Sequence, residues 1–159
     1  MRTSTIGAAL ELEFAATCAR KGAIVCAPLG GYGLSFDLIL LVGKCNFRVQ
    51  VKSATLSRNG YYVINTQPRI PTVGKNQVLS TRAVPYSEGA VDVLVTKIGE
   101  DWYFFKDVHL LPATIAIGAG KISKKYGHGA NAWRHIALDG SQDSVDAARS
   151  CADSLKVHV

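Results

Sequence analysis

Three polar residues lie beside two apolar segments of this 159-residue sequence and could do chemistry together. Asp37 stands just before an apolar run at 38–42, and Gln50 and Lys52 fall within a second run at 47–53. A carboxylate and an amide oxygen are ligands that Mg²⁺ accepts, and a lysine near a metal can have a lowered pKa. Such a group could hold a divalent cation and orient or deprotonate an attacking water.

The two apolar runs predict a pair of β-strands that would bring these side chains together. Residues 36–42 and 47–53 have strand composition, and the intervening residues 43–46 have the composition of a turn, so an antiparallel hairpin is the simplest interpretation. Side chains alternate between the two faces of a strand, so one face of this hairpin is expected to be wholly apolar. That face consists of Leu38, Leu40, Val42, Phe47, Val49 and Val51.

The register of this hairpin determines which polar residues meet. If Val42 faces Phe47, then Asp37 lies opposite Lys52. The two charges could then form a catalytic pair, but they could also form a structural ion pair in which each simply neutralises the other. The residue types and their spacing leave both interpretations open.

A helix over residues 5–21 is expected to precede the hairpin. Ser and Thr stand before it as possible caps, and Gly22 follows as a stop. Glu11 falls on the same helical stripe as Phe14 and Cys18, where an unpartnered carboxylate would be costly, so it requires a cation, a hydrogen-bond donor or a metal. A structural alternative pairs Glu11 with Arg48.

The charge of the chain is unevenly distributed. The net charge is +6, and residues 38–87 and 108–138 contain no Asp or Glu. Basic stretches of this kind suit a polyanion such as DNA, although a solvated basic surface is the alternative. Arg, Asn and Gln read base edges, and Arg and Lys contact phosphates. The DNA-contact candidates are Arg58, Lys75, Asn76, Gln77, Arg82, Lys121, Lys124 and Lys125.

The rest of the chain predicts a single α/β domain over residues 1–159. A strand is expected at 61–66 and a hairpin at 91–97 and 102–106, whereas residues 67–89 contain three prolines and are expected to be largely irregular. Basic loop insertions near 67–89 and 117–135 and a final helix near 142–155 complete the prediction. The apolar stretches are too short for a membrane helix, and the first residues do not open a signal-type apolar run, so an intracellular protein is expected rather than a secreted one.

The residues quoted above resemble the PD-(D/E)XK nuclease superfamily. Its core is a helix bearing a Glu, followed by a hairpin bearing an Asp and an acid-x-Lys triplet, and here Glu11, Asp37 and residues 50–52 follow in that order. Gln50 stands where most of the superfamily has Asp or Glu, and a Gln there is similar to the pattern of the intron-encoded homing endonuclease branch. Archaeal-type Holliday junction resolvases are related to that branch.

The resemblance implies a restriction-endonuclease-like core, in which an N-terminal helix is followed by a central mixed β-sheet with flanking helices. It also implies a Mg²⁺-dependent endonuclease, with Mn²⁺ as a substitute, that hydrolyses phosphodiester bonds in duplex DNA. Asp37 would be the direct metal ligand, joined by the Gln50 amide oxygen, the Val51 carbonyl and Glu11, and Lys52 would act on the water.

Two other functions remain open from the sequence. A structure-selective Holliday junction resolvase would use the same catalytic residues on a four-way DNA junction. A non-catalytic DNA-binding module would keep Asp37 and Lys52 as structural residues and bind DNA in a strongly salt-dependent way. A long, sequence-specific duplex target would imply a homodimer or homotetramer, and DNA as the substrate implies a cytoplasmic, nucleoid-associated protein.

Overall fold

The computed structural model describes residues 3–28, 34–73, 79–118 and 131–138. The predicted C-terminal helix near 142–155 and most of the basic insertion near 117–135 lie outside these ranges. The described elements are α1 (Thr3–Arg20), β1 (Ile24–Cys26), β2 (Leu38–Val42), β3 (Cys45–Val51), β4 (Ala54–Leu56), β5 (Tyr61–Asn65), β6 (Arg69–Val73), β7 (Leu79–Ala83), β8 (Val93–Ile98), β9 (Asp101–Phe105), the 3₁₀ helix η1 (Val108–Leu110), β10 (Thr114–Gly118) and the 3₁₀ helix η3 (Trp133–Ile136).

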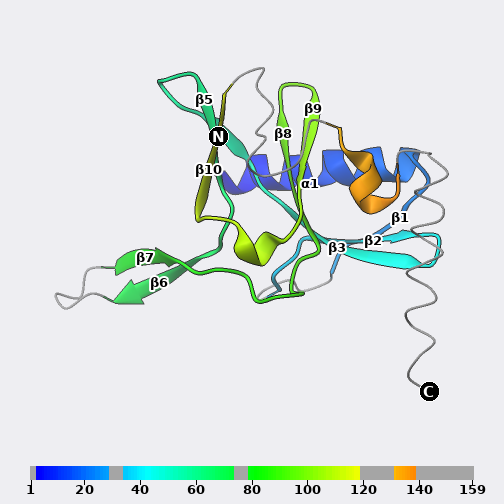
Figure 1. Ribbon diagram of the computed structural model, residues 1–159, viewed down its shortest axis with the longest axis horizontal. Helices are drawn as coiled ribbons and strands as arrows, with labels where there is room; N and C mark the ends of the chain where they lie inside the picture. The colour runs from blue at the N-terminus through cyan, green and yellow to red at the C-terminus, as the bar shows by residue number, and fades with distance from the viewer. Residues whose placement is uncertain (1–2, 29–33, 74–78, 119–130, 139–159) are drawn as a thin grey trace.

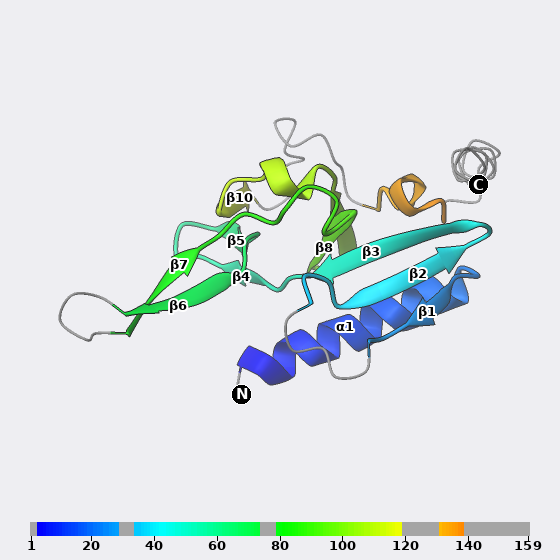
Figure 2. The same cartoon turned by 90° about the horizontal axis from the view of Figure 1, so that it is seen from below.

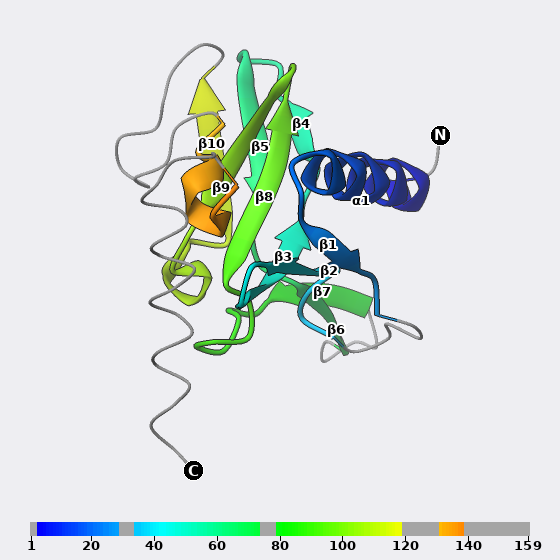
Figure 3. The same ribbon diagram turned by 90° about the vertical axis from the view of Figure 1, so that its right-hand side faces the viewer.

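A five-stranded sheet in the order β1-β2-β3-β8-β9 forms the centre of the molecule. Strands β3 and β8 run parallel and the other neighbours run antiparallel, so the sheet is mixed. Helix α1 covers one face, and a three-stranded sheet in the order β10-β5-β4 packs against the other, as Figures 1 and 3 show. This is the N-terminal helix and central mixed sheet of the predicted restriction-endonuclease-like α/β fold.

Helix α1 is held on the sheet by an aromatic core. Phe14 is fully buried and packs edge-on against Trp102, with ring centroids 4.8 Å apart, and stacks on Trp133 at 6.0 Å. Burying a Phe side chain of this kind contributes about 1.5–3 kcal/mol relative to leaving it exposed. Because Phe14 follows Glu11 by three residues, anchoring it also sets the helical face on which Glu11 lies.

The β2–β3 hairpin has a different register from the predicted one. Leu38 pairs with Val49 and Val42 pairs with Cys45, so the predicted pairing of Asp37 with Lys52 is wrong. The turn contains only two residues, and the first of them, Gly43, has φ 59°, which a type II′ hairpin turn requires of its first central residue. The shift is two residues, so every side chain keeps its predicted face.

The prediction that residues 67–89 are largely irregular is also wrong in its central part. Strands β6 and β7 pair antiparallel from Arg69 with Ala83 to Val73 with Leu79, and this ribbon projects from the body of the molecule (Figure 2). Both strands of a two-stranded ribbon are edge strands, so Pro71 can lie in β6 without costing a hydrogen bond of the ladder. The prolines therefore did not exclude strands here.

Candidate active site

Asp37 and the C-terminal end of β3 form the centre of the site. The Asp37 Oδ2 atom accepts hydrogen bonds from the Val51 backbone nitrogen, at 2.8 Å, and from Nε2 of Gln50. The same Nε2 lies 3.3 Å from the Val51 carbonyl oxygen. A carboxylate, a side-chain amide and a backbone carbonyl therefore converge, and β2 and β3 bring them together through the observed register.

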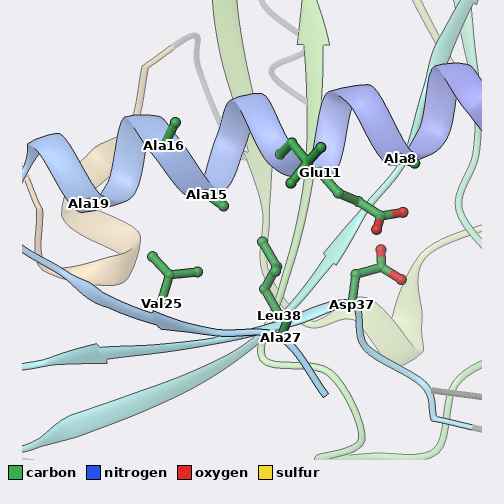
Figure 4. A pocket seen from close by; sticks show the side chains of 10 residues that line it. Ala8, Glu11, Ala15, Ala16, Ala19, Val25, Ala27, Asp37 and Leu38 are labelled. Carbon is green, nitrogen blue, oxygen red and sulfur yellow. The ribbon is translucent and has the colours of Figure 1, made fainter. Parts of the chain in front are cut away.

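Glu11 approaches this centre from α1. A groove of about 630 Å³ runs between α1 and strands β1 and β2, and both Glu11 and Asp37 line it. Figure 4 shows the two carboxylates pointing toward one another at one end of the groove. The structural alternative that paired Glu11 with Arg48 is wrong, because Arg48 forms its ion pair with Asp92 at 2.8 Å.

Lys52 immediately follows β3 and is anchored by its backbone. The Lys52 backbone nitrogen donates a hydrogen bond of 2.8 Å to the carbonyl of Val95 on β8. Among the described residues, the ion pairs within 4.0 Å are made by Arg48 and Lys97, so Asp37 and Lys52 do not form one. Lys52 still interacts electrostatically with both Asp37 and Glu11. The structure thus brings the four predicted catalytic residues together. Glu11, Asp37 and Lys52 interact electrostatically, and Gln50 is hydrogen-bonded to Asp37.

Burial perturbs the ionisation of this group. Desolvation raises the pKa of Asp37, against the opposing effects of the Val51 hydrogen bond and of Lys52. The pKa of Glu11 is raised by burial and then by Asp37, and lowered by Lys52. Burial lowers the pKa of Lys52, although both carboxylates oppose this shift. Neighbouring ionisable groups with shifted pKa values are typical of catalytic sites.

Sequence analysis missed two residues that contact the strand carrying the site, although they lie far from it in the sequence. The hydroxyl of Tyr86, a buried residue, donates a hydrogen bond of 3.3 Å to Oε1 of Gln50. Asp92 accepts hydrogen bonds from both the backbone and the guanidinium of Arg48. Each contact joins residues that are tens of positions apart, so no local pattern could have indicated either of them.

The predicted DNA-contact residues are dispersed over the structure. Arg58 is exposed in the turn between β4 and β5, and Arg82 is exposed on β7 in the projecting ribbon. Arg69, which was not singled out, is also exposed on the neighbouring strand β6. The other six predicted contacts lie outside the described residues and stay predictions, namely Lys75, Asn76, Gln77, Lys121, Lys124 and Lys125.

The residues present fit a divalent cation that takes oxygen ligands. Nε2 of Gln50 contacts both Asp37 and the Val51 carbonyl, so a hydrogen-bond donor occupies the place from which a cation would reach the same two oxygens. Within the described residues, no group of three or more Asp, Glu, His or Cys side chains is arranged to hold a metal. A cation here would therefore depend on amide and carbonyl oxygens as well as carboxylates, a donor set that Mg²⁺ accepts.

A glutamate-bearing helix on a mixed sheet, with an Asp, a Gln and a Lys at the end of one hairpin, defines a nuclease of the restriction-endonuclease-like fold. The family described as PD-(D/E)XK endonuclease matches residues 1–134, and the chain belongs to this family. Among solved structures, a bacterial homing endonuclease, I-Ssp6803I, is similar with a TM-score of 0.69 and 22% identity, over 94% of this chain and 99% of that one. A search of curated proteins finds no match.

No helix in the described part of the chain is long and apolar enough to cross a membrane.

Proposed function

We propose that this endonuclease hydrolyses phosphodiester bonds in duplex DNA with Mg²⁺, and that it acts on a specific sequence, as a homing endonuclease does. The observation that carries the proposal is the convergence of Glu11, Asp37, Gln50 and the Val51 carbonyl beside Lys52. Family membership supports the nuclease chemistry, and the likeness to a homing endonuclease supports the choice of branch.

Each residue of the site has a role that follows from its position. Asp37, Gln50, the Val51 carbonyl and Glu11 would hold Mg²⁺, with Mn²⁺ as a substitute. When bound, such a cation supplies charge stabilisation for the phosphoryl oxygens and a more acidic water. Lys52 would orient the attacking water and accept its proton, and the burial that lowers the pKa of Lys52 leaves more of its amine unprotonated and able to do so at neutral pH.

The β6–β7 ribbon is the part of the described structure that best fits a DNA groove. A two-stranded ribbon fits the width of the major groove, and here Arg69 and Arg82 are exposed on its two strands. Lys75, Asn76 and Gln77 fall between these strands in the sequence, and we propose that they and Arg82 read bases. Arg58, Lys121, Lys124 and Lys125 would contact phosphates.

A homodimer or homotetramer follows from the proposed substrate. One chain carries one such site among its described residues, and cutting both strands of a duplex at a symmetric target needs two sites related by a two-fold axis. Sedimentation of the protein with and without its DNA checks this assembly. A monomer that cuts both strands at once would contradict it.

The direct test is cleavage of two substrates, a supercoiled plasmid and a synthetic four-way junction, with and without Mg²⁺. We expect the wild type to cut, and Lys52→Ala to lose the activity while it still binds DNA. Lys44→Ala is the matched control, because Lys44 is an exposed lysine in the β2–β3 turn. Cleavage by Lys52→Ala at the wild-type rate would contradict the proposed site.

The same experiment separates the other two functions. Preferred cleavage of the junction would identify a structure-selective resolvase. Tight binding with neither substrate cut, even after a selection for cleavable sequences, would favour the non-catalytic DNA-binding module. That module also predicts no effect of Mg²⁺ on the stability of the protein, because a ligand stabilises a fold only where it binds.

A further inference from the structure

Gln50 is held on both sides of its side-chain amide. On one side Nε2 donates to Asp37 Oδ2 and lies 3.3 Å from the Val51 carbonyl. On the other side Oε1 accepts from the hydroxyl of Tyr86. Gln50 is 8% exposed and Tyr86 is 6% exposed, so water has little access to replace either contact.

This arrangement turns the wrong end of the amide toward the oxygens of the proposed metal site. An amide binds Mg²⁺ through its oxygen, but here the nitrogen faces Asp37 and Val51. To offer Oε1 to a cation at that place, the amide must make half a turn, which directs Nε2 toward Tyr86. A buried N–H group without an acceptor is costly, so the group on that side must then accept a hydrogen bond.

We propose that Tyr86 is the positioning residue that allows Gln50 to serve as a metal ligand, because its hydroxyl partners Gln50 in both orientations. A hydroxyl has one donor and two acceptor lone pairs, so Tyr86 can donate to Oε1 in the metal-free protein and accept from Nε2 when Oε1 is a ligand. A carboxylate at position 50 would need no such partner, because its two oxygens are equivalent. This inference rests on the proposed function and adds a positioning residue to the same site.

The neighbourhood of Tyr86 supports a role for the hydroxyl rather than for the ring alone. Tyr86 precedes Asp92 by six residues. The ion pair of Asp92 with Arg48 holds the segment entering β8 against β3, on which Gln50 lies. The ring belongs to the core that contains Leu94 and Ile115. Its hydroxyl is therefore directed from a packed core at one atom of the site.

The first test compares Mg²⁺ affinity, measured by calorimetry, in two backgrounds. In the wild-type background we expect Tyr86→Phe to weaken Mg²⁺ binding roughly three- to tenfold, because a hydrogen bond from a metal-polarised amide is stronger than the bond lost in the metal-free state. In a Gln50→Glu background the same change should weaken it less than about twofold. Tyr103→Phe is the control, because Tyr103 is a buried tyrosine of the same core, on β9.

A second measurement needs no substitution. In NMR spectra of the wild type, nuclear Overhauser contacts between the Gln50 side-chain NH₂ group and the Tyr86 ring should strengthen when Mg²⁺ is added. Unchanged contacts at saturating Mg²⁺ would overturn the inference, as would an equal effect of Tyr86→Phe in both backgrounds. The proposed function fails differently, since a wild type that neither binds Mg²⁺ nor cuts DNA would overturn it and the inference together.

Discussion

Asp92 binds Arg48 through three hydrogen bonds and so ties the beginning of β8 to the middle of β3. Its carboxylate accepts from the Arg48 backbone nitrogen at 2.7 Å, from Nε at 3.0 Å and from an η nitrogen at 2.8 Å. The Asp92 nitrogen donates in return to the Arg48 carbonyl. Since Arg48 precedes Gln50 by two residues, this contact holds the strand that carries the site.

Removing this carboxylate should destabilise the protein and the site together. We expect Asp92→Ala to lower the free energy of unfolding by about 1–2 kcal/mol, because a charge-assisted contact is lost and the Arg48 N–H loses its acceptor. Urea denaturation measures the change. Glu100→Ala is the control, because its contact with Lys97 is at the surface, and it should cost less than about 0.5 kcal/mol. Equal losses in the two variants would contradict this view of the contact.

Glu11→Gln should stabilise the metal-free protein at neutral pH. Burial and the Asp37 charge raise the pKa of Glu11 in the folded state, so its ionised form opposes folding. The gain should be a few tenths of a kcal/mol, since Glu11 is partly solvated. It should be complete above the folded pKa and vanish below the ordinary value of 4.5, where Glu11 is protonated in both states.

Urea denaturation at several pH values measures this gain. Glu13→Gln is the matched control on the same helix, because Glu13 pairs with Lys97 at 2.6 Å and its loss should destabilise the protein instead. A Glu11→Gln variant that is less stable than the wild type at neutral pH would show that Glu11 has a stabilising partner in the free protein.

Lys52→Arg should lose cleavage although it keeps the positive charge. A guanidinium stays protonated in proteins and cannot accept a proton from water, so we expect the rate to fall by about 100-fold or more. The wild-type rate should rise with pH and level off above the folded pKa of Lys52, which burial places below its ordinary value of 10.5. Single-turnover rates across pH measure both effects. Substantial activity in Lys52→Arg would limit Lys52 to an electrostatic role.

Arg82→Ala should weaken DNA binding and reduce its dependence on salt. If Arg82 contacts a phosphate, the slope of log affinity against log salt should fall by about one unit, whereas a base contact would change the preference at one position of the target. Arg20→Ala is the control, because Arg20 is exposed at the C-terminal end of α1, at the other end of the molecule from the ribbon (Figure 2). The same affinity, salt slope and base preference in Arg82→Ala, Arg20→Ala and the wild type would remove Arg82 from the interface.

Local patterns predicted the elements that carry the site and its chemistry, but not all of the contacts within it. The apolar face of the hairpin and the position of Glu11 on α1 follow from strand and helix periodicity, and both are confirmed. The register was wrong because it depends on the turn, and a tight turn at Gly43 was preferred to the longer one. The ribbon was missed because Pro68, Pro71 and Pro85 favoured an irregular segment over residues 67–89.

The sequence alone determined which residues could do the chemistry and their order along the chain, because residue type and periodicity are local properties. Only the tertiary structure decided that Asp37 meets Gln50 rather than Lys52, that Arg48 pairs with Asp92, and that Tyr86 contacts Gln50. These contacts join positions far apart in sequence, and they form because burying the two faces of the central sheet brings β3, β8 and the segment before β8 together. Packing, which no local pattern encodes, therefore completes the site.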